Sequence, residues 1–323
     1  LPNADALFLT AIDPYGHELW RWTFPVNKLN QQTEQLSPLS SRPIYTETEN
    51  DLTVKANKRT FIFSKKDGQL KGVSVDNRKI SFANGPRFIG ARRADRSLDQ
   101  FYNHDDEKAK EKDRTYSEFP DAAVFTKLDV KEDGGNLVVT ANYKLGNLDK
   151  AQWTINPSGE LALDYTYNFS GVVDLMGIRF DYPEDQVISK RWLGAGPYRV
   201  WQNRIHGTQY DVWENDYNDP IPGETFTYPE FKGYFGDVSW MNIQTKEGTI
   251  SLTNETPDAY IGVYQPRDGR DRLLYTLPES GISVLNVIPP VRNKVNSTDL
   301  CGPSSQPKWV NGPQTGRVIF RFM

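Results

Sequence analysis

Aromatic side chains are concentrated between Trp192 and Tyr234, among turn-forming and charged residues. The tryptophans and tyrosines of this stretch are Trp192, Tyr198, Trp201, Tyr210, Trp213, Tyr217, Tyr228 and Tyr234. A sugar ring stacks its C–H face on a flat aromatic ring, and its hydroxyls need hydrogen-bond donors and acceptors nearby. Glycines and prolines interrupt the stretch too often for a buried helix, so it is expected to form a long ordered connection at the surface, with the residue types that a sugar site needs. The alternative is that the rings hold this connection against its own sheet.

Carboxylates in the same stretch are candidates for glycoside hydrolysis, which uses two carboxyl groups that flank the scissile bond. These acidic residues include Asp211, Glu214, Asp216, Asp219, Glu224 and Glu230. No spacing singles out one pair among them. The sequence therefore assigns no catalytic residue to this chain.

Metal binding and nucleophilic catalysis lack the residue patterns that they need. His17, His104 and His206 show neither His-x-His nor His-Glu-x-x-His spacing, and each is expected to be a surface or hydrogen-bonded histidine. The single cysteine, Cys301, excludes an internal disulfide and a thiolate cluster, and no Gly-x-Ser-x-Gly motif is present. No metal site is predicted, although the many acidic residues leave an oxygen-ligated calcium open.

The charge and hydropathy of the 323 residues exclude several classes of partner. With a net charge of −4, the chain offers no electrostatic basis for binding nucleic acid or an anionic membrane. No apolar run approaches the roughly 18 residues that span a bilayer. The scarcity of cysteine fits a periplasmic or secreted protein, and a cytoplasmic location stays open. The chain begins at Leu1-Pro2-Asn3, without Met or a leader pattern, and is expected to be a mature product or a fragment.

The first elements that the sequence predicts are the two strands of a hairpin. Residues 6–12 and 17–24 flank the turn Asp13-Pro14-Tyr15-Gly16, and the second arm alternates like a half-buried strand. Residues 27–43 are rich in Gln, Ser, Asn and Pro and lack periodicity, as in a linker. Because two strands alone are marginally stable, residues 1–26 are expected to be the end of an upstream β domain.

Residues 44–323 are expected to form one large all-β domain. Short runs of alternating hydrophobicity, separated by turns such as Lys66-Asp67-Gly68, predict about a dozen strands and no amphipathic helix. The Asp-Gly pair of that turn is expected to supply positive φ angles. Residues 84–120 break the alternation and are expected to hold a short helix or a mobile loop. Repeated strands at this spacing predict a large antiparallel sandwich.

Three motifs that follow one another along the chain resemble motifs in the C-terminal domain of the family 2 glycoside hydrolases of the β-galactosidase group. A Trp-x-Gly-x-Gly-Pro motif occurs at Trp192-Leu193-Gly194-Ala195-Gly196-Pro197. A Tyr-Pro-Asp-Arg-like segment follows at Trp201-Gln202-Asn203-Arg204, and a Pro-x-Glu-x-Gly-like segment at Pro229-Glu230-Phe231-Lys232-Gly233. The hairpin resembles the end of that family's immunoglobulin-like domain, and residues 58–70 resemble the entry to its large β domain, the galactose-mutarotase-like supersandwich.

The resemblance implies a C-terminal domain that shapes the carbohydrate site and packs on an upstream catalytic barrel, which carries both catalytic carboxylates. It implies a galactoside, or a plant or algal glycan, as the carbohydrate, and it leaves a homo-oligomer open. No cofactor is expected in this chain, whereas the barrel of the parent enzyme could hold a divalent cation. Whether the chain is an enzyme by itself stays open. The alternatives are a self-sufficient mutarotase-type epimerase that relies on His206 and an independent carbohydrate-binding module.

The resemblance also assigns residues to two roles. In that family a loop near the C-terminus places a tryptophan at the sugar; the matching segment is Asp299-Leu300-Cys301-Gly302-Pro303-Ser304, with Trp309 in the same loop. The residues expected to bind carbohydrate are Trp309, Cys301, Ser304, Trp201, Arg204 and Trp213. The residues expected to form scaffold are Trp192, Gly194, Gly196, Pro197, Pro229, Glu230 and Gly233. Of these, Gly194 and Gly196 are expected to set backbone turns, and Pro197 a bend.

Overall fold

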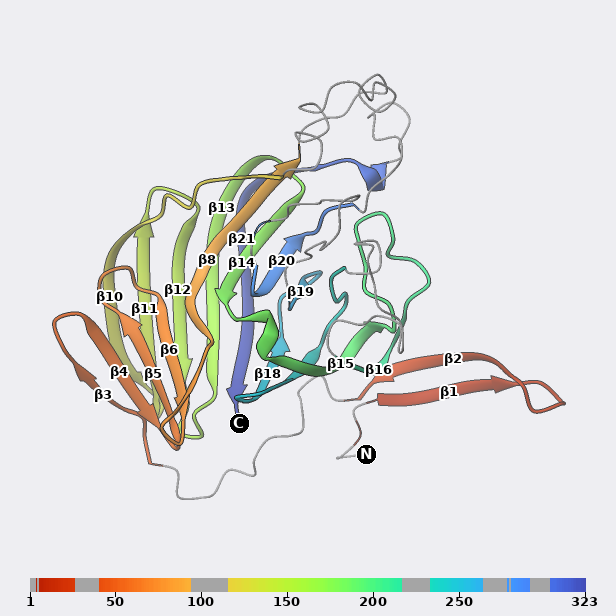
Figure 1. Cartoon of the computed structure of the whole chain (residues 1–323), viewed down its shortest axis with the longest axis horizontal. Coiled ribbons are helices and arrows are strands. Elements are labelled where there is room, and N and C mark those ends of the chain that lie inside the picture. The colour runs from red at the N-terminus through yellow and green to blue at the C-terminus, as the bar shows by residue number, and fades with distance from the viewer. Residues whose placement is uncertain are drawn as a thin grey trace.

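The fold is all-β in a computed structural model that describes residues 4, 6–26, 41–93, 116–216, 233–263, 278, 280–290 and 303–323. Within these residues the helical elements are short 3-10 turns, η1 at Glu184–Gln186 and η3 at Pro303–Ser305. None of the described helices is long and apolar enough to span a membrane. Figure 1 shows two large curved sheets with a hairpin that projects from one end. The prediction of a large antiparallel all-β sandwich is confirmed.

The first sheet has nine strands, and neighbouring strands pair antiparallel. In spatial order they are β10 (Val124–Asp133), β11 (Asn136–Lys144), β12 (Leu148–Ile155), β13 (Leu161–Val173), β21 (Lys308–Phe322), β18 (Gly248–Asn254), β17 (Trp240–Thr245), β15 (Val187–Gly196) and β16 (Gln209–Asp216). The C-terminal strand β21 thus lies in the middle of this sheet, beside β13. This strand begins at Lys308, so that it includes Trp309.

The second sheet has ten strands and is also antiparallel. Its main path is β19 (Tyr260–Gly262), β20 (Ile282–Val287), β14 (Leu175–Asp181), β8 (Ala83–Arg93), β6 (Leu70–Val75), β5 (Arg59–Ser64), β4 (Asp51–Ala56) and β3 (Ile44–Glu47). Two short strands complete it: β7 (Arg78–Ile80) pairs with β6, and β9 (Tyr116–Glu118) pairs with β8.

The main core lies between the two sheets and is rich in aromatic rings. The ring of Phe63, on β5, lies 5.9 Å from that of Trp153 on β12, and the ring of Phe180, on β14, lies 5.4 Å from that of Phe320 on β21. Each pair joins one sheet to the other. Burial alternates along β5, as expected for a strand with one face on a core.

Strand β8 corrects the expectation for residues 84–93, the first part of the stretch 84–120 that was expected to hold a short helix or a mobile loop. It is an eleven-residue strand, and residues 94–115 after it lie outside the described part. Phe88 faces the main core, whereas Ile89 and Ala91 face a second apolar cluster on the other side of the sheet. Because both faces of β8 are covered, its sequence lacks the alternation that marks a half-buried strand.

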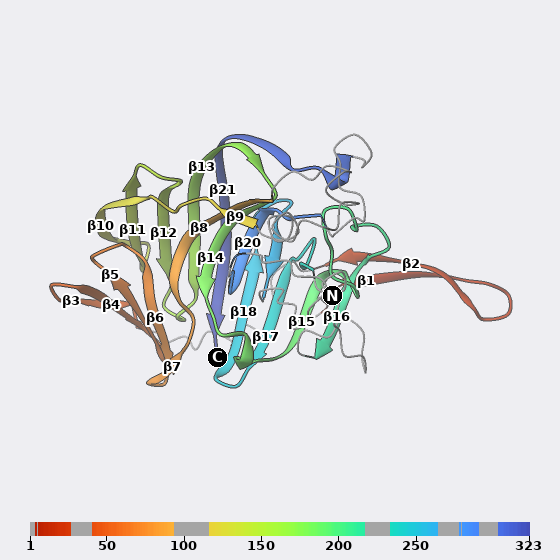
Figure 2. The same ribbon diagram turned by 45° about the horizontal axis from the view of Figure 1, so that its top comes forward.

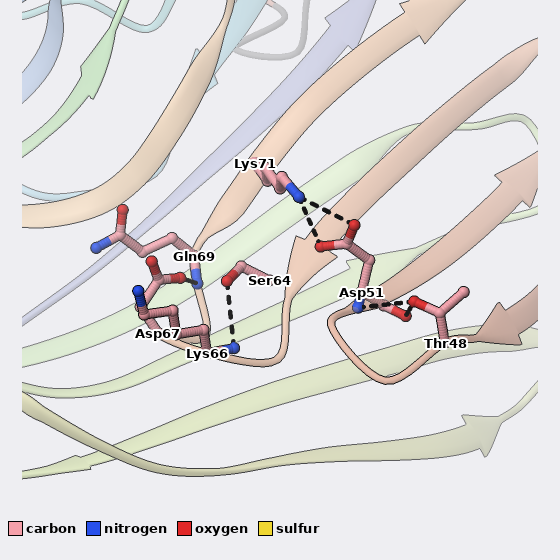
Figure 3. A network of polar contacts seen from close by, with 7 residues as sticks. All are labelled: Thr48, Asp51, Ser64, Lys66, Asp67, Gln69 and Lys71. Atoms are coloured by element: carbon pink, nitrogen blue, oxygen red, sulfur yellow. Dashed lines mark hydrogen bonds and ion pairs between the residues drawn. The ribbon is translucent and has the colours of Figure 1, made fainter.

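Figure 3 shows the turn between β5 and β6, where positive φ angles were expected for the Asp-Gly pair. Only Gly68 has one, of 75°. Asp67 instead accepts a hydrogen bond at Oδ1 from the backbone N–H of Gln69 (3.1 Å), and Ser64 Oγ accepts one from the backbone N–H of Lys66 (3.3 Å). Short polar side chains therefore close this turn, and the expectation for Asp67 was wrong.

The carboxylate of Glu247, in the turn between β17 and β18, ties the nine-stranded sheet to residues beside the ten-stranded sheet. It accepts hydrogen bonds from Ser81 N (2.8 Å), from Ser81 Oγ (2.6 Å) and from the Tyr182 hydroxyl (3.2 Å). The substitution Glu247→Ala removes the acceptor of all three, so the free energy of unfolding should fall by about 1–3 kcal/mol. Urea denaturation measures the change, with Glu132→Ala, at an exposed position of β10, as the control. Equal midpoints for the two variants would contradict this role.

The hairpin of β1 (Ala6–Ile12) and β2 (Glu18–Pro25) forms a two-stranded sheet of its own, as predicted. Figure 2 shows it extending away from the two large sheets, next to β16. Arg21 Nη1 lies 3.8 Å from Asp211 Oδ2 of β16. Both faces carry exposed apolar side chains: Leu7, Phe8, Leu9, Ile12, Leu19, Trp20, Trp22 and Phe24. Of the predicted linker, residues 27–43, only 41–43 are described. The division into domains stays a prediction.

Candidate functional site

The Trp-x-Gly-x-Gly-Pro motif lies at the end of strand β15, not in a loop as the sequence suggested. Trp192 is buried; its Nε1 donates to the carbonyl oxygen of Ala195 (3.0 Å), and its ring packs edge-on against Phe235 at 4.9 Å. These contacts place Trp192 in the main core.

Gly194 and Gly196 are strand residues without a positive φ, so they do not set backbone turns. Their need for glycine is steric. A Cβ at Gly194 would lie 3.0 Å from the Gly236 carbonyl oxygen, and a Cβ at Gly196 would lie 2.4 Å from Cδ1 of Trp213. Gly194 therefore allows the backbone at Gly236 to approach the strand closely, and Gly196 allows the Trp213 ring to pack on it.

The Pro-x-Glu-x-Gly-like motif packs, through Gly233, against Val200, the residue that precedes the Trp201–Arg204 segment. After a bend at Pro197, Val200 and Tyr234 exchange backbone hydrogen bonds of 2.8 Å in both directions. A Cβ at Gly233 would lie 2.4 Å from the Val200 carbonyl oxygen and 3.0 Å from Trp201 Nε1, so only glycine fits there. Pro229 and Glu230, the other predicted scaffold residues of this motif, lie outside the described residues.

The segment Trp201–Arg204 forms a tight turn, closed by a hydrogen bond from Arg204 N to the Trp201 carbonyl oxygen (2.8 Å). Trp201 is only 2% exposed, and its ring meets Tyr234 edge-on at 5.6 Å in the second cluster. Stacking on a sugar requires an exposed ring face, so this burial argues against the sugar contact predicted for Trp201. Arg204 lies on the exposed side of the same turn.

Gln202 joins this turn to the segment before β21, and sequence reasoning missed it. Its side-chain amide donates to the carbonyl oxygens of Ser304 (2.9 Å) and Gln306 (2.6 Å), and its backbone N–H donates to the carbonyl oxygen of Pro289 (3.0 Å). The only sequence signal was its position inside the Trp201–Arg204 motif. The structure thus brings together two regions that the sequence had selected separately.

The remaining predicted sugar contacts differ in exposure. Trp309 is 71% exposed at the start of β21, where it pairs with Val172 of β13. Ser304 is exposed in η3. Trp213, on β16, is half-buried: its Nε1 donates to the Gln209 carbonyl oxygen (3.0 Å), and its ring covers Gly196. Cys301 lies outside the described residues.

A cavity of about 690 Å³ lies elsewhere, between the hairpin and the nine-stranded sheet. Its lining includes Thr23, Pro25, Tyr210, Asp237, Ser239 and Asp258, and none of the residues predicted to bind carbohydrate. The Tyr210 hydroxyl lies 2.7 Å from Ser239 Oγ, and burial raises the pKa of Tyr210.

Metal-ligating side chains do not cluster in the part of the chain that the structure describes. No group of three or more His, Cys, Asp or Glu residues could hold a metal ion there. His17 lies on the hairpin, with Nδ1 3.0 Å from Asp13 Oδ2, and His206 is exposed in a turn. The third histidine, His104, lies outside the described residues.

Comparisons with known proteins bear on both the sequence and the fold. The family model of the beta galactosidase small chain matches residues 55–289. No curated protein matches the chain in a sequence search.

Three solved structures illustrate the structural likeness. One is a galactose 1-epimerase from Lactobacillus acidophilus NCFM, with a TM-score of 0.47 and 10% identity over 87% of this chain and 98% of that chain. A second is a GalM/aldose epimerase homologue from C. elegans, with a TM-score of 0.39 and 8% identity over 87% of this chain and 99% of that chain. A third is a galactose mutarotase-like protein from Lactobacillus casei ATCC 334, with a TM-score of 0.37 and 11% identity over 87% of this chain and 100% of that chain.

Proposed function

Because this chain belongs to the family of the beta galactosidase small chain, we propose that it shapes the carbohydrate site of a β-galactosidase-like glycoside hydrolase of family 2. In this proposal the catalytic carboxyl groups lie outside the chain, in a barrel on which the domain packs. The carbohydrate is a galactoside, or a plant or algal glycan that contains one.

The observation that supports this role most is the meeting of the Trp201–Arg204 turn with the segment from Ser304 to Trp309. Gln202 fastens the two backbones together, although they are about a hundred residues apart in sequence. Trp309 offers an exposed aromatic face, and Arg204 and Ser304 are exposed polar residues. An exposed ring with polar groups in neighbouring segments is what a sugar needs.

The hairpin supports the proposal that residues 1–26 end an immunoglobulin-like domain that precedes this one. A two-stranded sheet is marginally stable in water by itself, and this one exposes apolar side chains on both faces. Strands of an upstream domain would cover these faces. Three further expectations stay predictions: a periplasmic or secreted location, no cofactor in this chain, and a homo-oligomer.

Hydrolysis of nitrophenyl galactoside tests the proposed division of labour. We expect turnover by the intact protein and none by residues 1–323 alone, after near-UV circular dichroism has established that the isolated chain is folded. Turnover by the isolated chain, abolished by a substitution within it, would overturn the non-catalytic role. Saturable galactose binding to the isolated chain without turnover would instead indicate an independent carbohydrate-binding module, and interconversion of galactose anomers would indicate a mutarotase-type enzyme.

A further inference from the structure

The side chain of Gln202 is a buried double donor. It is 7% exposed, and its Nε2 donates to two carbonyl oxygens of one segment, those of Ser304 (2.9 Å) and Gln306 (2.6 Å). The orientation of the amide follows from these partners, because the reverse orientation would set its oxygen against two carbonyl oxygens. The backbone N–H of Gln202 adds a third bond, to Pro289, which follows β20.

The other end of this amide is not satisfied. Gln202 Oε1 is buried without a hydrogen-bond partner among the described residues, and so is Nε1 of the adjacent Trp201. A buried polar atom without a hydrogen-bond partner is destabilising, so an amide here is not the most stabilising choice. What it supplies is two N–H donors on one nitrogen, which neither an apolar nor a carboxylate side chain can provide.

The segment that receives these bonds leads directly to Trp309. It consists of the 3-10 turn η3 and two further residues before β21 begins at Lys308. The Trp309 ring is 71% exposed, so packing in the core does not fix it. Pairing with Val172 of β13 holds the backbone of Trp309, and the bonds of Gln202 decide where the Trp201–Arg204 turn lies beside the segment that leads to it.

We infer that Gln202 is a positioning residue, which holds residues 304–306 and the Trp201–Arg204 turn together and thereby places that turn beside Trp309 at the carbohydrate site. The first part of this inference rests on the hydrogen bonds, and its effect on sugar binding rests on the proposed function. Gln202 does not itself touch the sugar.

The test uses the intact protein with Gln202→Glu, which keeps the size of the side chain but removes both N–H donors. We expect amide hydrogen exchange in residues 304–306 to become at least about tenfold faster, the effect of losing roughly 1.4 kcal/mol of local stability. KM for a nitrophenyl galactoside should rise by a similar factor, with kcat within about twofold of wild type. Gln202→Met removes the donors without burying a charge, and it decides the question if Gln202→Glu does not fold.

The matched control is Gln314→Glu. Gln314 lies on β21, and its amide donates to the Pro313 carbonyl oxygen (3.2 Å) in a solvent-exposed hydrogen bond. Unchanged exchange in residues 304–306 of folded Gln202 variants would overturn the inference, whatever the activity. Faster exchange with an unchanged KM would overturn the link from Gln202 to the sugar. If the intact wild-type protein does not hydrolyse galactosides, the proposed function fails and exchange alone decides whether Gln202 holds the segment.

Discussion

The substitution Phe180→Ala will lower the free energy of unfolding by about 3–5 kcal/mol, the largest stability effect expected of a single change in this chain. Phe180 is fully buried on β14, where the two sheets meet. Its ring stacks on Phe82 at 4.7 Å and meets Phe320 edge-on at 5.4 Å. Removing it deletes contacts to both sheets and leaves a cavity that surrounding strands cannot close without shifting.

Denaturation of the intact protein by guanidinium chloride measures this loss, provided that the unfolding of this domain gives a separate transition. Tyr15→Ala is the control, because Tyr15 is 86% exposed in the turn of the hairpin. A decrease below about 1 kcal/mol for Phe180→Ala would contradict the placement of this ring at the centre of the core.

The substitution Trp309→Ala will raise KM for a galactoside by about tenfold and leave the fold intact, which is the largest effect expected on sugar binding. An exposed ring contributes little to the core, so its removal should not change the unfolding midpoint. Stacking of a sugar on an aromatic face is worth roughly 1–1.5 kcal/mol, which corresponds to this factor in affinity. Trp309→Phe keeps an aromatic face and should recover most of the affinity.

Tyr45→Ala is the matched control for Trp309→Ala. Tyr45 is an exposed aromatic residue on β3, the edge strand of the ten-stranded sheet. Both views place β3 at the end of the molecule opposite the hairpin, away from β15 and β16 (Figures 1 and 2). Equal KM values for wild type and Trp309→Ala, in an enzyme that hydrolyses galactosides, would remove Trp309 from the carbohydrate site.

The sequence by itself determined the fold class, most strands and the family. The alternation along β5 and the hairpin of β1 and β2 are local patterns, because a strand shows its buried face in every second residue. The order of the three motifs, from Trp192 to Gly233, pointed to the family that the match over residues 55–289 shows. Strand β8 was missed because apolar neighbours cover both of its faces, which erases the alternation.

Only the tertiary structure decided which of the selected residues face solvent. The sequence selected both Trp201 and Trp309 as sugar contacts. In the structure Trp201 is buried with its ring against Tyr234, whereas Trp309 is exposed to solvent. Gly194 and Gly196 looked like turn residues, but backbone at Gly236 and the ring of Trp213 require them. Gln202 gave no signal of its own, because its partners lie about a hundred residues away. The burial of Trp201 and the hydrogen bonds of Gln202 depend on residues that are distant in sequence, so a local sequence pattern does not predict them.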